Sequence, residues 1–444
     1  MNEQNTYKGF WWLSDTPSRR VSGSMSILSN GDVVFESIGE LEDNDFLSSS
    51  SNNSQLSTIW GVDSNDTPIS IFGFEVGISQ NTSCSFSIVR YNVQVAVIGA
   101  HLKSRDEKRN YNVKVCIPEL SLWYRPNCLK FCQQGNGISW TTNTGDANEV
   151  SVPIEDGCQL QIASQIKIIE DNYGLKMEIE QESMLHFDFS LPISMQEAKR
   201  KVFSFEQFLS FATLTPIQCS HFWLIDKDEK TTGKAIEVIE RKYPRKANVR
   251  FWEYLFVFDT IKDSFSKIIA KWFGEKELFP IRAHLIDSIS HKGYFDANDF
   301  LILCQAIEGF YCRFRKEDKL SNIIRNLIHE FSDIHIQEIS VDDIPFIQDT
   351  RNHLSHLLPS GKKKHVLHGK ELYNLNHKLR KLLICCVLKL IGFSNDEMNN
   401  LFAHSRNSYL RMVNGEQRNI AEEEVTNLDV DVLSTTIEKE IEPE

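Results

Sequence analysis

The sequence predicts an α+β protein, in which an N-terminal antiparallel β-sandwich or barrel-like domain is followed by a C-terminal all-α helical bundle. Up to about residue 190, short segments rich in β-branched and aromatic residues alternate with turn residues. From about residue 261 onward, apolar residues recur instead every three to four positions, as on one face of a helix. The chain has 444 residues, of which 41% are hydrophobic, so it can build the cores of two or three globular domains.

A hairpin pattern opens the β-rich domain, which we expect to cover residues 1–190. Asn30-Gly31 separates two segments of alternating apolar residues, and this dipeptide favours the tight turn of a β-hairpin. The polar run at residues 47–58 has too few apolar residues to pack, which predicts a loop. The other strand-like segments have the spacing of an antiparallel sandwich or barrel: residues 69–76, 83–89, 93–98, 113–117, 159–169 and 175–179.

A mixed α/β segment, residues 191–294, is expected to join this domain to the bundle. Ser194 precedes a helical pattern at residues 195–211 and is a good N-cap residue. Residues 217–225 and 235–239 have the apolar content of short strands.

Five helices are expected in the bundle, residues 295–415, and an acidic tail is expected at residues 416–444. The third helix begins near Ser340, with Asp343 three residues later as in a capping box, and ends at Pro359-Ser360-Gly361. The second, fourth and fifth helices are expected near residues 320–331, 369–390 and 396–412. The first has one apolar face, formed by Phe300, Leu303, Cys304, Ile307, Phe310, Tyr311 and Phe314.

The expected compartment is the cytoplasm. No secretory signal and no apolar run long enough to span a bilayer is present in the sequence, so no membrane partner is expected. The ten cysteines are scattered, and a chain of this length needs no disulfide framework. The sequence also lacks the P-loop, the dinucleotide-binding glycine pattern, HExxH and GxSxG.

Charge is distributed unevenly along the chain. The net charge of −13 argues against a generally basic nucleic-acid-binding coat. The stretch from residue 351 to residue 390, however, contains nine Lys or Arg residues and a single acidic residue, Glu371. This run is either a solvated helix face or a surface that holds a polyanion, in which case Lys362, Lys363 and Lys364 would bind the substrate.

The segment DTRNHLSH, residues 349–356 on the third helix, combines Arg351, Asn352 and His356 in a short amphipathic helix. It resembles the R-N-x3-H signature of HEPN ribonuclease domains, and the helix containing QAIE, residues 305–308, resembles the first helix of such domains. Near the N-terminus, YKGFWWLSD, VSGSMSILSNGDVVFESIGEL and PELSLWYR resemble the β-rich domain of the ApeA family of bacterial anti-phage proteins.

The resemblance implies a metal-independent endoribonuclease of abortive anti-phage defence, a dimer that leaves 2′,3′-cyclic phosphate products. The residue types suit this chemistry. Histidine, with a pKa of about 6.5, exchanges protons at neutral pH, which makes His356 the candidate acid or base. Arg351 offers a planar fork for phosphate oxygens, and the amide of Asn352 can orient either partner.

Helix geometry favours a homodimer or a higher homo-oligomer. At about 100° per residue, Arg351 and His356 lie roughly 140° apart around the helix, whereas Asn352 and His356 share a face. Two copies related by a two-fold axis would bring the missing group to each site. The expected substrate is RNA in single-stranded loops, such as tRNA anticodon loops, and a phage-derived trigger is a candidate partner.

Three other interpretations of these residues stay open. Arg351 can be an exposed residue paired with an acid and His356 an interior histidine; Glu308 can either face Arg351 or be a simple surface carboxylate. The spacing of His353 and His356, which His365 and His368 repeat, allows a metal site, but no acid lies between residues 351 and 370, so we expect no metal and no cofactor. At the level of function, the alternative is a non-catalytic HEPN module for dimerisation or RNA binding.

Overall fold

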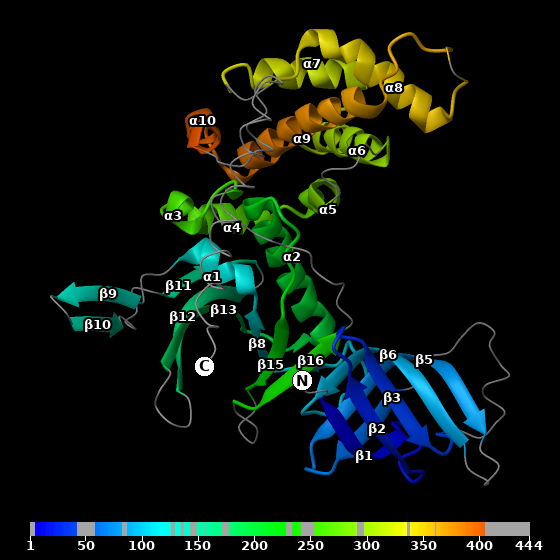
Figure 1. Cartoon of the computed structure of the whole chain (residues 1–444). Helices are drawn as coiled ribbons and strands as arrows, with labels where there is room; N and C mark the ends of the chain where they lie inside the picture. The colour runs from blue at the N-terminus through cyan, green and yellow to red at the C-terminus, as the bar shows by residue number, and fades with distance from the viewer. Residues whose placement is uncertain are drawn as a thin grey trace, which may run out of the picture.

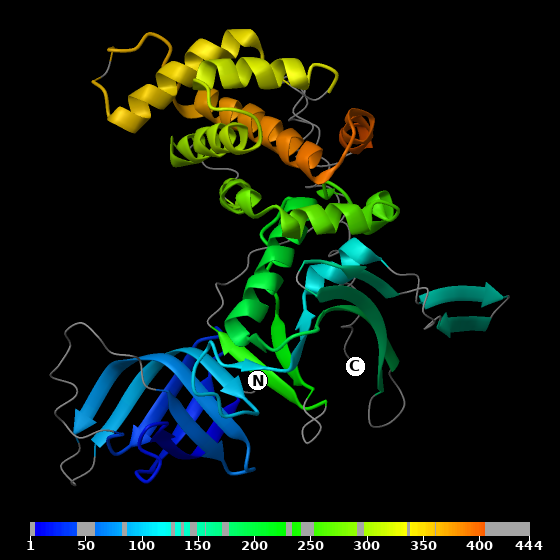
Figure 2. The ribbon, with the colours of Figure 1, turned by 180° about the vertical axis from the view of Figure 1, so that it is seen from behind.

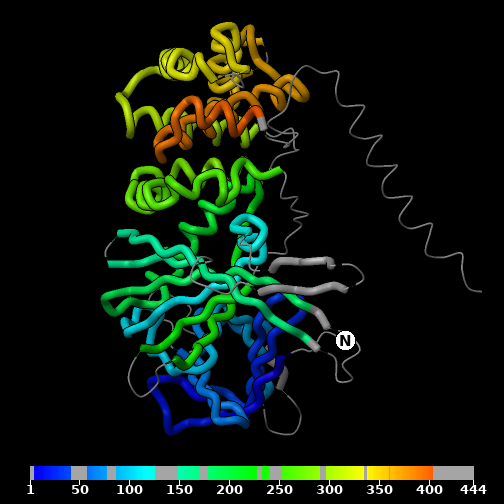
Figure 3. The backbone as a smooth tube through the Cα atoms, turned by 90° about the vertical axis from the view of Figure 1, so that its left-hand side faces the viewer, coloured from blue at the N-terminus to red at the C-terminus, as the bar shows by residue number. Residues whose placement is uncertain are grey.

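The computed structural model describes thirteen stretches of the chain: residues 5–41, 58–81, 87–125, 129–134, 137–142, 149–155, 157–170, 177–227, 233–240, 253–290, 297–334, 338–359 and 361–404. The molecule is elongated, with a β-barrel at one end, an open curved sheet next to it and the helical bundle at the other end (Figures 1 and 3). This confirms the predicted α+β order of a β domain before an all-α bundle. The predicted acidic tail and most of the predicted loop at 47–58 lie outside the described residues.

The barrel closes because the two strands at the ends of its strand order, β5 and β6, pair with each other. The order is β6-β3-β2-β1-β4-β5, and β5 pairs back with β6, all antiparallel. The Asn30-Gly31 turn joins β2 to β3 as predicted, with Gly31 at a φ of 83° that favours glycine. The six strands are β1 (Thr6–Leu13), β2 (Val21–Ile27), β3 (Val33–Ile38), β4 (Ile59–Asp63), β5 (Pro68–Asn81) and β6 (Ser87–Ile98).

Strand β6 belongs to both the barrel and the open sheet. Strand β5 pairs along one edge of β6, while β3 pairs with residues 88–93 and β16 with residues 95–98 on the other. The open sheet continues in the order β16-β15-β8-β13-β12-β11, so it includes two strands that follow the predicted end of the β-rich domain at residue 190. Its strands are β8 (Tyr111–Cys116), β11 (Glu149–Pro153), β12 (Cys158–Glu170), β13 (Met177–Phe189), β15 (His221–Asp226) and β16 (Ala235–Glu240). Two short pairs complete the strands: β9 (Leu129–Gln134) with β10 (Gly137–Thr142), and β7 (Lys108–Arg109) with β14 (Ile193–Ser194).

Helix α2 (Met195–Thr213) connects the open sheet to the helices above it (Figures 1 and 2). The predicted N-cap is present: the backbone N–H of Glu197 donates to Oγ of Ser194, in a complete capping box. In the middle of α2, the carbonyl of Ser204 accepts a 2.8 Å hydrogen bond from the indole of buried Trp272 on α4. The neighbouring helices are α1 (Pro118–Tyr124), α3 (Phe258–Ile261), α4 (Phe265–Gly274) and α5 (Phe279–Ser290), with a 3₁₀ turn, η3 (Lys276–Leu278), before α5.

The bundle shares one hydrophobic core with the open sheet and α2, whereas the barrel interior has a core of its own. The predicted capping box of Ser340 and Asp343 is present, in a 3₁₀ turn, η4 (Val341–Asp343), that leads into α8. No helix among the described residues is long and apolar enough to cross a membrane. The bundle helices are α6 (Ala297–Phe314), α7 (Leu320–Glu330), α8 (Ile344–His356), α9 (Gly369–Ile391) and α10 (Asn395–His404).

Candidate functional site

All eight residues of the DTRNHLSH segment lie in α8, at the end of the molecule farthest from the barrel (Figure 1). The buried side chains of Ile344, Ile347 and Thr350 face the core, and Leu354 packs against it. Their spacing of three and four residues fixes the rotation of the helix about its axis. The polar residues between them are therefore directed toward other helices or toward solvent.

Arg351 is half-buried and faces α6. Its Nη2 lies 3.5 Å from Oε2 of Glu308, and the two side chains are 34% and 27% exposed. Of the two readings of Glu308 that the sequence left open, the structure has the one in which it faces the arginine. A guanidinium carries five N–H donors, and a single carboxylate cannot engage all of them. The pairing with Glu308 therefore leaves Arg351 able to bind phosphate oxygens.

The environment of the pair shows how close the two charges lie to the core. Burial raises the pKa of the Cys304 thiol, which lies one turn before Glu308 on α6. Glu308 raises that pKa further and Arg351 lowers it. The thiol therefore stays protonated at neutral pH, and Cys304 is not a nucleophile for this site.

His356 is the last residue of α8 and is exposed, whereas Asn352, one turn earlier, is half-buried. The helix ends with Leu357 in the left-handed conformation, at a φ of 46°, and this apolar side chain is 87% exposed. A left-handed residue that is neither Gly nor Asn is uncommon at such a position. The exposed imidazole thus stands next to an exposed, strained leucine.

The three predicted substrate-binding lysines lie in the connection from α8 to α9, and they are not equivalent. Nζ of Lys363 lies 3.4 Å from Oδ1 of Asp349 on α8, and its side chain is 34% exposed. Lys362 and Lys364, on either side of it, are exposed. The structure thus brings Lys363 of this connection to the same helix as Arg351, Asn352 and His356.

Histidines also meet here without forming a metal site among the residues described. The rings of His353 on α8 and His368 pack edge to face, with centroids 6.0 Å apart. Within the described part of the chain, no group of three His, Cys, Asp or Glu side chains is placed to hold a metal ion.

Two family models match this chain in consecutive regions. The model described as ApeA N-terminal domain 1 matches residues 6–272, more than half of the chain. The model described as Apea-like HEPN matches residues 305–397. The chain belongs to the ApeA family. Comparisons with the curated proteins and with the solved structures found no match.

The region matched by the ApeA N-terminal model contains the barrel, the open sheet and the helices from α1 to most of α4. The HEPN region contains Glu308 and every predicted site residue from Arg351 to Lys364. An ApeA-like HEPN region fits a nuclease-type protein of anti-phage defence, and HEPN domains typically dimerise and act on RNA.

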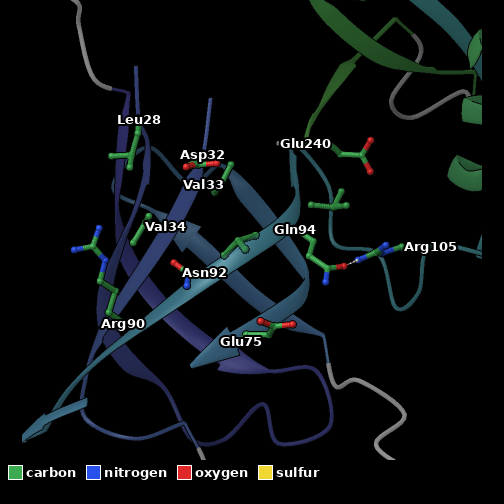
Figure 4. Close-up of a pocket in the computed structure, with 12 residues that line it drawn as sticks. Leu28, Asp32, Val33, Val34, Glu75, Arg90, Asn92, Gln94, Arg105 and Glu240 are labelled. Carbon is green, nitrogen blue, oxygen red and sulfur yellow. Dashed lines mark hydrogen bonds between the residues drawn. The ribbon is translucent and has the colours of Figure 1, made fainter. Parts of the chain in front are cut away.

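A cavity of about 580 Å³ lies in the N-terminal region of this ApeA-family chain, far from α8 (Figures 1 and 4). Its polar lining has both signs of charge, and Nη2 of Arg105 donates a 3.3 Å hydrogen bond to Gln94. Sequence reasoning missed it; the detectable pattern was the polar residues Arg90, Asn92 and Gln94 at every second position of β6. The mixed charges fit no single class of ligand.

Proposed function

We propose that this chain is a metal-independent endoribonuclease whose active site is assembled from Arg351, Asn352 and His356 of two copies. It would cut RNA by attack of a ribose 2′-OH on the adjacent phosphate, in abortive anti-phage defence. The observation that carries the proposal is the arrangement on α8: a half-buried arginine held by Glu308 and an exposed histidine at the helix end.

The chemistry needs only these groups. One His356 takes the proton of the 2′-OH, whose oxygen then forms a bond to phosphorus while the bond from phosphorus to the 5′-oxygen breaks. His356 of the partner subunit donates a proton to the departing 5′-oxygen. Arg351 stabilises the charge that develops on the phosphoryl oxygens, and Asn352 orients the imidazole one turn away. The products are a 2′,3′-cyclic phosphate and a 5′-hydroxyl.

The geometry of α8 supports a site shared by two copies. Arg351 is directed toward α6, whereas His356 extends from the exposed end of α8. Contact between two α8 ends would place the histidine of one copy near the arginine of the other. The 87% exposed side chain of Leu357 supplies apolar surface for that contact.

The substrate class follows from the reaction. In-line attack needs a ribose-phosphate linkage that can rotate, which a stacked duplex denies, so single-stranded loops such as tRNA anticodon loops are the proposed targets. The connection that carries Lys362, Lys363 and Lys364 adds positive charge near α8, which attracts the RNA backbone. A phage-derived trigger would release the activity in infected cells.

The test is incubation of the purified protein with total cellular RNA in EDTA, followed by mapping of the 3′ ends. We expect discrete cuts that leave 2′,3′-cyclic phosphates, and no cuts by Arg351→Ala or His356→Ala. Light scattering of the same sample should give a dimer or a larger assembly. A monomer that still cleaves RNA, or cleavage that EDTA abolishes, would overturn the proposal.

The second candidate is a non-catalytic module that binds RNA, which the engagement of Arg351 by Glu308 favours. In that case, Arg351→Ala would weaken RNA binding, and the wild-type protein would leave RNA intact. The nuclease proposal expects instead that the wild-type protein cuts RNA, and that His356→Ala keeps most of the RNA affinity while losing the cleavage.

A further inference from the structure

The connection from α8 to α9 is held against one stripe of α8. Phe346, Asp349, Thr350 and His353 follow the spacing of one helix face. Phe346 contacts His365, and Asp349 contacts Lys363 and His365. Thr350 contacts His365 and Leu367, and His353 contacts His368. Because contact positions rise together in both segments, residues 365–368 run alongside α8 in its own direction. We call residues 361–368 the lysine loop.

Thr350 is the centre of this attachment. It is fully buried, its hydroxyl accepts a 3.0 Å hydrogen bond from the backbone N–H of Leu367, and it donates at 3.4 Å to the carbonyl of His365. The side chain of Leu367 packs against the core. One hydroxyl thus satisfies two backbone groups of the lysine loop where water has little access.

Asp349 makes the second attachment. Its Oδ2 accepts a 3.2 Å hydrogen bond from the backbone N–H of His365, and its Oδ1 lies 3.4 Å from Nζ of Lys363. Asp349 is only 19% exposed and also holds the backbone of His365, so it is a fixed partner for Lys363. Unlike the guanidinium of Arg351, which has five N–H donors in a planar fork, the ammonium of Lys363 is a single point charge already engaged by this carboxylate. Its neighbours Lys362 and Lys364 are exposed on either side.

We infer that Asp349 and Thr350 are positioning residues, and that Lys362 and Lys364, but not Lys363, bind the RNA phosphates. This inference rests on the proposed function and divides its three lysines by role. A loop that is fixed before RNA arrives loses less conformational freedom on binding, so the two exposed lysines hold the backbone beside Arg351 and His356 at little entropic cost. Lys363 instead pairs with Asp349 and so fastens the loop to α8.

Three matched substitutions test the division: Lys362→Gln, Lys363→Gln and Lys364→Gln, each in a His356→Ala background that does not cleave. The glutamine at 363 keeps an N–H donor for Asp349 while removing the charge. The measurement is the salt dependence of binding to an unstructured oligouridylate. The slope of log K against log salt should become shallower by about 0.7 in the variants at 362 and 364 and stay unchanged at 363. Equal slopes in all three variants would overturn the inference while leaving the nuclease proposal intact.

The positioning role is tested with Thr350→Val and Thr350→Ser, first by hydrogen exchange without RNA and then by RNA binding. Loss of the hydroxyl in the valine variant should speed hydrogen exchange of the Leu367 amide by about tenfold, and the serine variant should restore protection. RNA affinity should fall and recover in the same order. Parent-like exchange and affinity in the valine variant would remove the positioning role. If the His356→Ala parent fails to bind the oligouridylate at low salt, the lysine assignment and the RNA substrate fall together, while the exchange data still decide the loop attachment.

Discussion

Two arginine–carboxylate pairs connect α6 to its neighbours in the bundle, and they differ in exposure. Arg380 of α9 donates through Nη2 to Asp299 at 2.5 Å and through Nε to Ser288 at 2.6 Å, with the paired side chains only 2% and 3% exposed. Arg351 of α8 meets Glu308 at 3.5 Å, with both side chains about a third exposed. The same helix therefore holds one arginine as a fixed structural part and the other in a looser pair.

The difference teaches what a substrate-binding arginine requires. Burial lowers the pKa of Arg380 and the charge of Asp299 opposes that shift, so the carboxylate offsets part of the cost of burying the guanidinium. Opening this pair would leave a buried charge without compensation. The half-exposed Arg351 can exchange its carboxylate partner for a phosphate at small cost, because solvent reaches both groups.

The first prediction compares how much each arginine–carboxylate pair contributes to the free energy of unfolding. Asp299→Ala leaves the Arg380 charge buried without its partner, so the free energy of unfolding should fall by about 3–5 kcal/mol. The matched change Glu308→Ala at the half-exposed pair should cost less than about 1 kcal/mol. Urea unfolding followed by helical circular dichroism measures both. Similar losses in the two variants would mean that Arg351 is as structural as Arg380.

The second prediction concerns the shape of the Arg351 side chain. Arg351→Lys keeps the charge but loses the planar fork, so single-turnover cleavage should slow by about 10²–10³-fold with little change in unfolding free energy. The control is Arg380→Lys, which should lower the unfolding free energy of the bundle, whereas Arg351→Lys should not. Wild-type cleavage by the lysine variant would show that only charge, and not fork geometry, matters at this position.

The identity of the paired arginines was only partly predictable from the sequence. The spacing of Arg351, Asn352 and His356 on a short helix was visible, and so was Glu308 as a candidate partner. The attachment of the lysine loop was not, because it depends on backbone groups of His365 and Leu367 returning to α8 across an irregular segment. Side-chain patterns do not report where backbone N–H groups find their acceptors.

The fold shows the same division between local and distant information. The Asn30-Gly31 turn and the Ser194 cap act within a few residues and were predicted correctly. The pairing of β6 with β3, β5 and β16 joins segments far apart in the chain. Alternation along β6 indicates a strand but does not specify its three partners.

The third prediction concerns RNA binding, for which Glu308 and the RNA phosphates compete for Arg351. Glu308→Gln removes the charge that competes with RNA for Arg351, and one such contact in water is worth about 1 kcal/mol. The dissociation constant for a single-stranded oligoribonucleotide in the His356→Ala background should therefore fall by about fivefold at low salt and converge with that of the parent at high salt. A weaker complex would mean that Glu308 orients the arginine rather than competing with RNA.

The helix ends repeat the contrast between α9 and α8. Helix α9 ends at Gly392, whose φ of 117° costs glycine little. Helix α8 ends at Leu357 with a φ of 46°, in a conformation that disfavours leucine and leaves its side chain in solvent. Helices α1 and α2 also end in left-handed residues other than glycine, Arg125 and Leu214, but the one at the end of α8 adjoins a predicted site residue, His356.

The last prediction tests whether the strained leucine serves the assembly. Leu357→Asn places a residue that tolerates the left-handed region at the same cap, so the unfolding free energy should stay the same or rise by less than about 1 kcal/mol. The same change removes apolar surface from the proposed contact between two α8 ends. The dimer should therefore dissociate at a higher protein concentration than the wild-type dimer in sedimentation velocity, and cleavage should fall in parallel. Arg125→Asn at the end of α1, where the φ is 48°, is the control, because it changes an equivalent left-handed cap without touching the contact. A Leu357→Asn protein that stays dimeric and fully active would place the interface elsewhere and leave the strain at Leu357 without a role in catalysis.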